Sequence, residues 1–195
     1  MEQQTSILLG PQGCGKGTQA ELLKESFMRR DPKRVTVHFE MGSALRSFGN
    51  EEGYTQALLA ASLKRGELQP AFLTTHVIAR FFIQAMRGDE HLIIDGYPRS
   101  LEQFADFDSL MRFYRREALT IFWIEISDKT ALARLLARGR NDDTEESIRR
   151  RLGWTRREMS SVLAKLRELG YRVVEINGER PIPEVAADIT AALSL

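Results

Sequence analysis

Short apolar runs alternate along the chain with longer stretches in which apolar residues recur every three or four positions. The short runs have the length and composition of strands. They are Ser6–Leu9, Val35–Phe39, His91–Asp95, Thr120–Ile126 and Tyr171–Ile176. The longer stretches have the period of amphipathic helices. They are Thr18–Arg30, Ser43–Phe48, Tyr54–Arg65, Thr74–Arg87, Leu101–Tyr114, Lys129–Arg138, Glu145–Leu169 and Ile182–Leu193.

This alternation of strands and helices predicts an α/β fold with a parallel five-stranded sheet and helices on both faces. The run Leu92–Ile94 is apolar without alternation, as expected of a strand buried on both sides. The chain has no internal repeat, low-complexity tract or long linker, so we expect a single domain over residues 1–195. Two segments fit the alternation poorly, Gly42–Leu73 and Gly139–Thr144.

A glycine-rich loop follows the first predicted strand. It has the pattern G-x-x-x-x-G-K from Gly10 to Lys16, and its first hydroxyl follows at Thr18. The glycines allow the backbone N–H groups to turn inward around a phosphate, and the following helix adds its N-terminal dipole. Lys16 can reach the terminal phosphates, and Thr18 can lie near Mg²⁺. The loop predicts a P-loop NTPase-type fold and a nucleotide-binding function.

Composition narrows the function classes further. The formal net charge is +1, which argues against a nucleic-acid or membrane-surface binder. The single cysteine, Cys14, excludes an internal disulfide and a cysteine-cluster zinc site. The N-terminus has no signal-peptide pattern, and no stretch approaches the roughly 18 apolar residues of a membrane span. We therefore expect a cytoplasmic protein without structural zinc.

Five motifs occur in a fixed order along nearly the whole chain. They are Gly10–Ala20 (GPQGCGKGTQA), Met41–Arg46 (MGSALR), Asp95–Gln103 (DGYPRSLEQ), Arg138–Leu152 (RGRNDDTEESIRRRL) and Asn177–Pro181 (NGERP). In sequence, order and spacing they resemble the adenylate kinase family of nucleoside monophosphate kinases, in its short-lid form. The resemblance implies Mg²⁺-dependent, reversible phosphoryl transfer from ATP to a nucleoside monophosphate. It also implies a small acceptor-binding insert at about residues 42–73 and a short lid at about 138–149.

The resemblance assigns residues to the ATP half of the site. Those implied to bind ATP are Gly13, Cys14, Gly15, Lys16, Gly17, Thr18, Arg134, Arg138, Gly178 and Arg180. Thr18 and Asp95 are implied to hold Mg²⁺, the latter through water. Asp95 comes at the end of a predicted buried strand, where an acid commonly takes this role in P-loop enzymes.

The resemblance also assigns the acceptor half. Residues implied to bind the monophosphate are Met41, Gly42, Arg46, Glu67, Leu68, Gln69, Gly96, Tyr97, Pro98, Arg99, Gln103, Arg140 and Arg151. Those implied to act in catalysis are Lys16, Asp95, Arg99, Arg138, Arg140 and Arg151. Their role is to position the reactants and to stabilise negative charge during transfer.

The Arg138–Leu152 motif contains charged residues outside these sets. Asp142 and Asp143 could be taken for a metal pair, but they are expected to cap the following helix and tether arginines of the lid. Arg149 and Arg150 are expected to lie on a solvated helix face.

The acceptor motif departs from the family pattern. Adenylate kinases typically have Thr-Gly where this chain has Met41-Gly42, preceded by Glu40. Gln103, by contrast, favours adenine, because the pyrimidine-specific relatives usually have Asn there. We expect AMP as the acceptor, with CMP, UMP or GMP as the alternative.

A non-catalytic nucleotide-binding protein is the alternative of another class, and the complete set of arginines argues against it. The partners expected are ATP and a monophosphate. The oligomeric state is open between monomer and trimer, with a monomer the working expectation.

Overall fold

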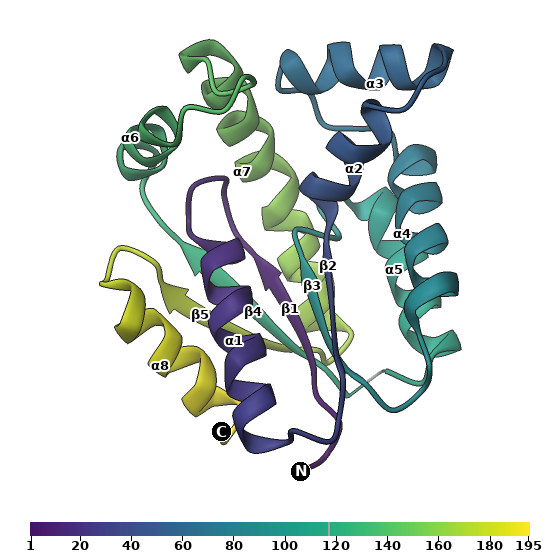
Figure 1. The fold of residues 1–195 in the computed structure, drawn as a ribbon. Coiled ribbons are helices and arrows are strands. Elements are labelled where there is room, and N and C mark those ends of the chain that lie inside the picture. Colours follow the sequence, from purple (N-terminus) through teal and green to yellow (C-terminus); the bar gives the residue numbers. More distant parts are fainter. Residues whose placement is uncertain (117) are drawn as a thin grey trace.

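A five-stranded parallel sheet forms the centre of the molecule (Figure 1). The computed structural model describes residues 1–116 and 118–195. The strands are β1 (Thr5–Leu9), β2 (Thr36–Glu40), β3 (His91–Asp95), β4 (Thr120–Glu125) and β5 (Arg172–Asn177). They lie in the order β2-β3-β1-β4-β5, and every neighbouring pair is parallel. The predicted parallel sheet is confirmed.

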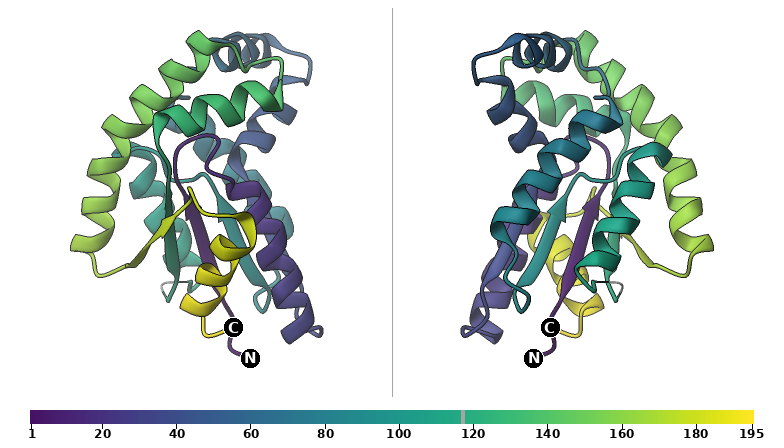
Figure 2. Two further views of the ribbon diagram at one scale, coloured as in Figure 1. Left: turned by 90° about the vertical axis from the view of Figure 1, so that its left-hand side faces the viewer. Right: turned by 90° about the vertical axis from the view of Figure 1, so that its right-hand side faces the viewer.

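Helices cover both faces of this sheet (Figure 2). They are α1 (Lys16–Arg30), α2 (Met41–Gly49), α3 (Tyr54–Lys64), α4 (Ala71–Ala85), α5 (Leu101–Phe113), α6 (Asp128–Arg138), α7 (Glu145–Glu168) and α8 (Ile182–Ala192). Helices α1 and α8 pack together on one face, and α4, α5 and α7 pack on the other. None of the helices in residues 1–116 and 118–195 is long and apolar enough to cross a lipid bilayer.

Successive residues of the central strand β1 divide between two hydrophobic clusters. Ile7 and Leu9 belong to the cluster shared with α4, α5 and α7, whereas Leu8 belongs to the cluster shared with α1 and α8. Side chains alternate between the two faces of a strand, so both faces of β1 are buried. The same division holds in β3, where Ile94 lies in the first cluster and Ile93 in the second. The unbroken apolar run of β3 therefore reflects burial on both sides, as predicted.

The helix boundaries differ from the predicted ones by up to three residues. Helix α4 begins at Ala71 rather than Thr74, and Pro70 occupies its N-cap. Proline is tolerated at this end of a helix because the first N–H groups have no partner within the helix. Helix α1 begins at Lys16, directly after the glycine-rich loop, so the loop leads straight into the helix N-terminus.

The two segments that fit the alternation poorly lie at the same end of the molecule. Residues 42–73 contain most of α2, all of α3 and the start of α4, and Figure 1 shows α2 and α3 beyond the carboxyl ends of the strands. Residues 139–144 connect α6 to α7. Strand β1 lies between β3 and β4, so the strands that follow β1 along the chain lie on both sides of it in the sheet. In open α/β sheets such a switch point forms a crevice that binds ligands.

Candidate active site

A cavity of about 820 Å³ lies at this switch point. Its wall is formed by the loop after β1, the start of α1, α2, residues 66–69, the ends of α6 and α7 that face each other, and the loop after β5. The volume is in the range typical of small-molecule sites. Segments far apart in the sequence therefore supply one binding site.

The glycine-rich loop has a conformation that requires glycine. Gly10 has a φ of +152°, and a Cβ there would lie 2.3 Å from the carbonyl oxygen of Ile124. The loop closes over the side chain of Lys16, which is 8% exposed. Its Nζ donates to the carbonyl oxygens of Gly10 and Pro11, both at 3.0 Å. The ammonium group is thus held inside the loop, where it can meet a phosphate.

Asp95 and Thr18 line the cavity next to this loop. Asp95 ends β3 and is 5% exposed, and its Oδ2 lies 4.0 Å from the position of a Cβ on Gly17. Burial raises the pKa of Asp95, and the positive charges of Lys16 and Arg99 oppose that rise. A buried carboxylate and a hydroxyl beside a phosphate loop fit Mg²⁺, which is usually bound by few protein oxygens together with phosphates and water. The described residues contain no group of three or more Asp, Glu, His or Cys that could hold a metal.

Arginines from distant elements converge on the other half of the cavity. Arg99 donates from Nε to the carbonyl oxygen of Gly96 at 2.7 Å, which directs its guanidinium group into the cavity. Burial lowers the pKa of Arg99, as does the positive charge of Arg151, while Asp95 opposes the change. Partial burial and the positive charges of Arg138 and Arg46 lower the pKa of Arg140. The guanidinium groups of Arg46, Arg99, Arg138, Arg140 and Arg151 all line this one cavity, as an anion-binding site requires.

Glu40 and Gln103 also line this half of the cavity. The Oε1 of Glu40 lies 3.3 Å from a terminal nitrogen of Arg46. The Oε1 of Gln103 accepts from the backbone N–H of Arg99 at 2.8 Å, so its amino group is the part available to a ligand. The side-chain amide of Gln69 instead donates to the hydroxyl of Ser62, near the end of α3, and to the carbonyl oxygen of Glu67.

Asp143 organises the arginines that flank the 139–144 connection. Its carboxylate, fully buried, accepts from Nε and a terminal nitrogen of Arg138 at 2.9 and 3.0 Å, and from Arg151 at 2.7 Å. These bonds lower the pKa of Asp143 although burial acts to raise it. The predicted tether of lid arginines is confirmed. The cap of α7, however, is Thr144, whose hydroxyl accepts from the backbone N–H of Ser147.

Arg149 and Arg150, which precede Arg151 on α7, do not line the cavity. Arg149 pairs with Glu145 and is 64% exposed, and Arg150 pairs with Glu146 and is 43% exposed. The predicted solvated face is confirmed for both.

The loop after β5 borders the cavity on the side of the glycine-rich loop. Arg134 donates to the carbonyl oxygen of Gly178 at 3.2 Å and approaches that of Gly13 at 3.5 Å, so it joins this loop to the glycine-rich loop. Arg180 lines the cavity, but its guanidinium group is paired with Glu184 and Asp188 of α8.

Most of the residues predicted for the site lie together on the cavity wall. Gly96, Tyr97 and Pro98 do not. Tyr97 is fully buried and its hydroxyl donates to the carbonyl oxygen of Gln103 at 3.1 Å, so this turn supports Arg99 from behind. Sequence reasoning missed Trp154, which lines the cavity from α7. Its spacing of three residues from Arg151, one helical turn, was the available signal.

A parallel sheet with a glycine-rich loop between its central strand and α1, and with a buried acid at the end of the neighbouring strand, defines a P-loop nucleotide-binding protein. The family model described as "Adenylate kinase" matches residues 8–170. The chain is 33% identical to an adenylate kinase of Prochlorococcus marinus over 97% of this chain and 96% of the relative.

Two further relatives are similar over comparable lengths. An adenylate kinase 1 of Nostoc sp. is 32% identical over 96% of this chain and 97% of its own. An adenylate kinase of Corynebacterium aurimucosum is 33% identical over 92% and 93%. The chain belongs to the adenylate kinase family, whose members are phosphotransferases that use ATP and a nucleoside monophosphate.

Proposed function

We propose that this chain catalyses the Mg²⁺-dependent, reversible conversion of ATP and AMP into two ADP. The observation that carries the proposal is the convergence of Lys16, Arg99, Arg140 and Arg151 on one cavity that has a phosphate loop at one end. A monophosphate acceptor is already an anion, so its transfer needs positioned positive charge rather than a general base.

In this proposal the two halves of the cavity have separate roles. The glycine-rich loop, Arg134 and the loop after β5 bind ATP, and residues 42–73 with Arg99 bind the acceptor. Residues 138–149 act as the lid. Thr18 and Asp95 would hold Mg²⁺, which supplies neutralising charge on the phosphates when it is bound. We take the enzyme to act as a monomer in the cytoplasm, and light scattering of the purified protein tests the oligomeric state.

The choice of AMP as acceptor is supported by Gln103. Its amino group can donate to a ring nitrogen of adenine, since its carbonyl oxygen is occupied by Arg99. The alternative, a CMP, UMP or broad-specificity kinase, is favoured by Met41, which replaces the threonine typical of adenine-specific relatives. Steady-state assays with ATP and each of AMP, CMP, UMP and GMP decide between them. Comparable kcat/KM for CMP would overturn the choice of AMP.

A non-catalytic nucleotide-binding protein would use the same ATP half. Arg140→Ala distinguishes the two functions, because Arg140 lines the cavity and, among the described residues, only its backbone carbonyl oxygen is hydrogen-bonded, to the N–H of Asp143. We expect kcat to fall by about 10²-fold or more, as for the loss of other groups that stabilise transition-state charge, with little change in ATP affinity. Arg149→Ala is the matched control, because Arg149 points to solvent. A loss of ATP affinity without a loss of kcat would favour a binding role.

A further inference from the structure

Trp154 joins parts of the cavity that the sequence keeps far apart. It lies on α7, one turn after Arg151, and is 7% exposed. Its indole Nε1 donates to the carbonyl oxygen of Gly66 at 3.0 Å. Its ring lies below the guanidinium group of Arg99, whose Cζ is 5.7 Å from the ring centroid.

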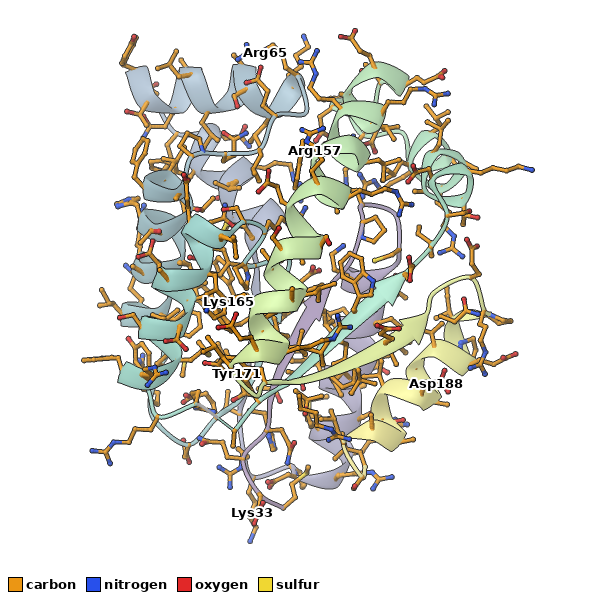
Figure 3. The ribbon with its side chains drawn as sticks, turned by 180° about the vertical axis from the view of Figure 1, so that it is seen from behind. Lys33, Arg65, Arg157, Lys165, Tyr171 and Asp188 are labelled. Atoms are coloured by element: carbon orange, nitrogen blue, oxygen red, sulfur yellow. The ribbon has the colours of Figure 1, made fainter. Side chains whose placement is uncertain are left out.

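The contact with Gly66 holds the connection between α3 and α4 against α7. Gly66 has a φ of +72°, and a Cβ at this position would lie 2.5 Å from the carbonyl oxygen of Ser147. Residue 66 is therefore in close backbone contact with α7 at the same time as it accepts from Trp154. Figure 3 shows Arg65, the preceding residue, beside the N-terminal part of α7. The buried carbonyl oxygen of Gly66 would lose its partner if the indole N–H were removed.

The contact with Arg99 fixes a positive charge without using its terminal N–H groups. The Nε of Arg99 is held by Gly96, and the aromatic ring attracts the guanidinium group from one face. No described residue accepts a hydrogen bond from the two terminal nitrogens of Arg99, so they are directed at the cavity for an anion. A leucine or alanine at position 154 would leave the guanidinium group free to turn about its side-chain bonds.

We propose that Trp154 is a positioning residue for the acceptor monophosphate. Its N–H holds loop 66–69, which borders the acceptor base, while its ring face holds Arg99, which meets the acceptor phosphate. One side chain on the helix of Arg151 thus sets the distance between the two ends of the acceptor and aligns both with the transfer site. This inference rests on the proposed function in one respect only, that the ligand of this half of the cavity is a nucleoside monophosphate.

Two substitutions separate the two contacts. Trp154→Phe keeps an aromatic ring under Arg99 and removes the N–H, and we expect the KM for AMP to rise about tenfold, as for a buried carbonyl left without its donor. Trp154→Leu removes both contacts, and we expect a rise of about thirtyfold or more. The KM for ATP should stay within about twofold in both. Trp123→Phe is the matched control, because Trp123, on β4, is the other of the two tryptophans and is not on the cavity wall.

The Trp123→Phe protein also provides a spectroscopic readout. Its only tryptophan is Trp154, so its fluorescence reports the surroundings of the acceptor half. A phosphate that pairs with Arg99 draws the guanidinium group toward itself. This movement changes the electric field at the indole ring of Trp154. Titration with AMP should therefore change the emission intensity and saturate, whereas ATP without AMP should change it less. Inorganic phosphate serves as the probe of the phosphate end alone.

The outcomes distinguish this inference from the proposed function. If the wild type phosphorylates AMP and both Trp154 variants keep its KM for AMP, the positioning role is wrong and the proposed function stands. An equal rise in the KM for ATP shows a general structural role and also overturns the inference. If the wild type phosphorylates no monophosphate, the proposed function fails, and the fluorescence titration still decides the inference: no response to AMP overturns it. Should Trp154→Leu fail to fold, Trp154→Phe and the titration carry the test.

Discussion

Asp143→Asn tests whether the flanking arginines depend on one buried carboxylate. The change keeps the size of the side chain and one carbonyl oxygen but removes the negative charge. In the structure this charge accepts two hydrogen bonds from Arg138 and one from Arg151, and the carboxylate is fully buried. The substitution therefore removes the ion-pair partner of Arg138 and leaves Arg151 with only the more distant carboxylate of Asp142.

The expected loss in the free energy of unfolding follows from the burial of the ion pairs. Removing one partner of a buried ion pair costs about 3–5 kcal/mol. The Arg138 side chain is 34% exposed and can be solvated, whereas that of Arg151 is 11% exposed and cannot be fully. We therefore expect the free energy of unfolding to fall by about 2 kcal/mol, which corresponds to a Tm lower by about 4–8 °C for a chain of this size. We also expect kcat to fall about tenfold, because both arginines lose their fixed orientation.

The stability that the Asp143 carboxylate contributes should depend on pH, and its direction of change follows from the pKa. The pKa of Asp143 in the folded protein lies below its ordinary value of 3.8. The stability that this charge contributes is fully present above the unfolded pKa and is lost as the pH falls through the lower folded pKa. The difference between wild type and Asp143→Asn should thus be constant from pH 7 to about 5 and should narrow below about pH 4.

Urea unfolding across this pH range measures the effect, and Asp142→Asn is the matched control. Asp142 is the preceding residue, its side chain is 21% exposed, and its carboxylate lies 3.6 Å from Arg151. A pair of this kind contributes at most about 1 kcal/mol. If the two variants lose equal stability at pH 7, or if the difference for Asp143→Asn widens in acid, the reasoning about the buried carboxylate is wrong.

Three further predictions concern other parts of the molecule. Arg116→Met should lower the free energy of unfolding by about 3 kcal/mol in urea titrations, since it leaves Glu90 buried without its cation, and adding Glu90→Gln should recover part of this loss. Cys14 is 3% exposed beside Lys16, so its alkylation should be slow and should be slowed further by ATP; equal labelling rates with and without ATP would contradict this. Glu40→Gln should lower the KM for AMP several-fold, because the acceptor phosphate then no longer competes with a carboxylate for Arg46; a higher KM would show that Glu40 positions the arginine instead.

Local patterns in the sequence determined the secondary structure and the phosphate loop. The apolar run of β3 and the helical period of Glu145–Leu169 are set by neighbours within a few residues, so both elements are found within one residue of their predicted ends. The spacing from Gly10 to Lys16 likewise predicts the loop, because its backbone conformation depends on the glycines themselves. The start of α4 differs from the predicted Thr74 because Pro70 occupies the N-cap and the helix begins directly after it, at Ala71.

Only the tertiary structure decided how the arginine-lined half of the cavity is assembled. The order β2-β3-β1-β4-β5 depends on which strands pair, and the linear pattern of apolar residues does not encode pairing. Tyr97 was expected at the ligand and is buried behind Arg99 instead, while Trp154 lies on the cavity wall. Gly66 and Trp154 are 88 residues apart and meet only because α7 packs across the sheet. The sequence by itself thus determined the phosphate loop and the elements that carry the arginines, whereas side-chain packing between distant elements decided which residues hold those arginines in place.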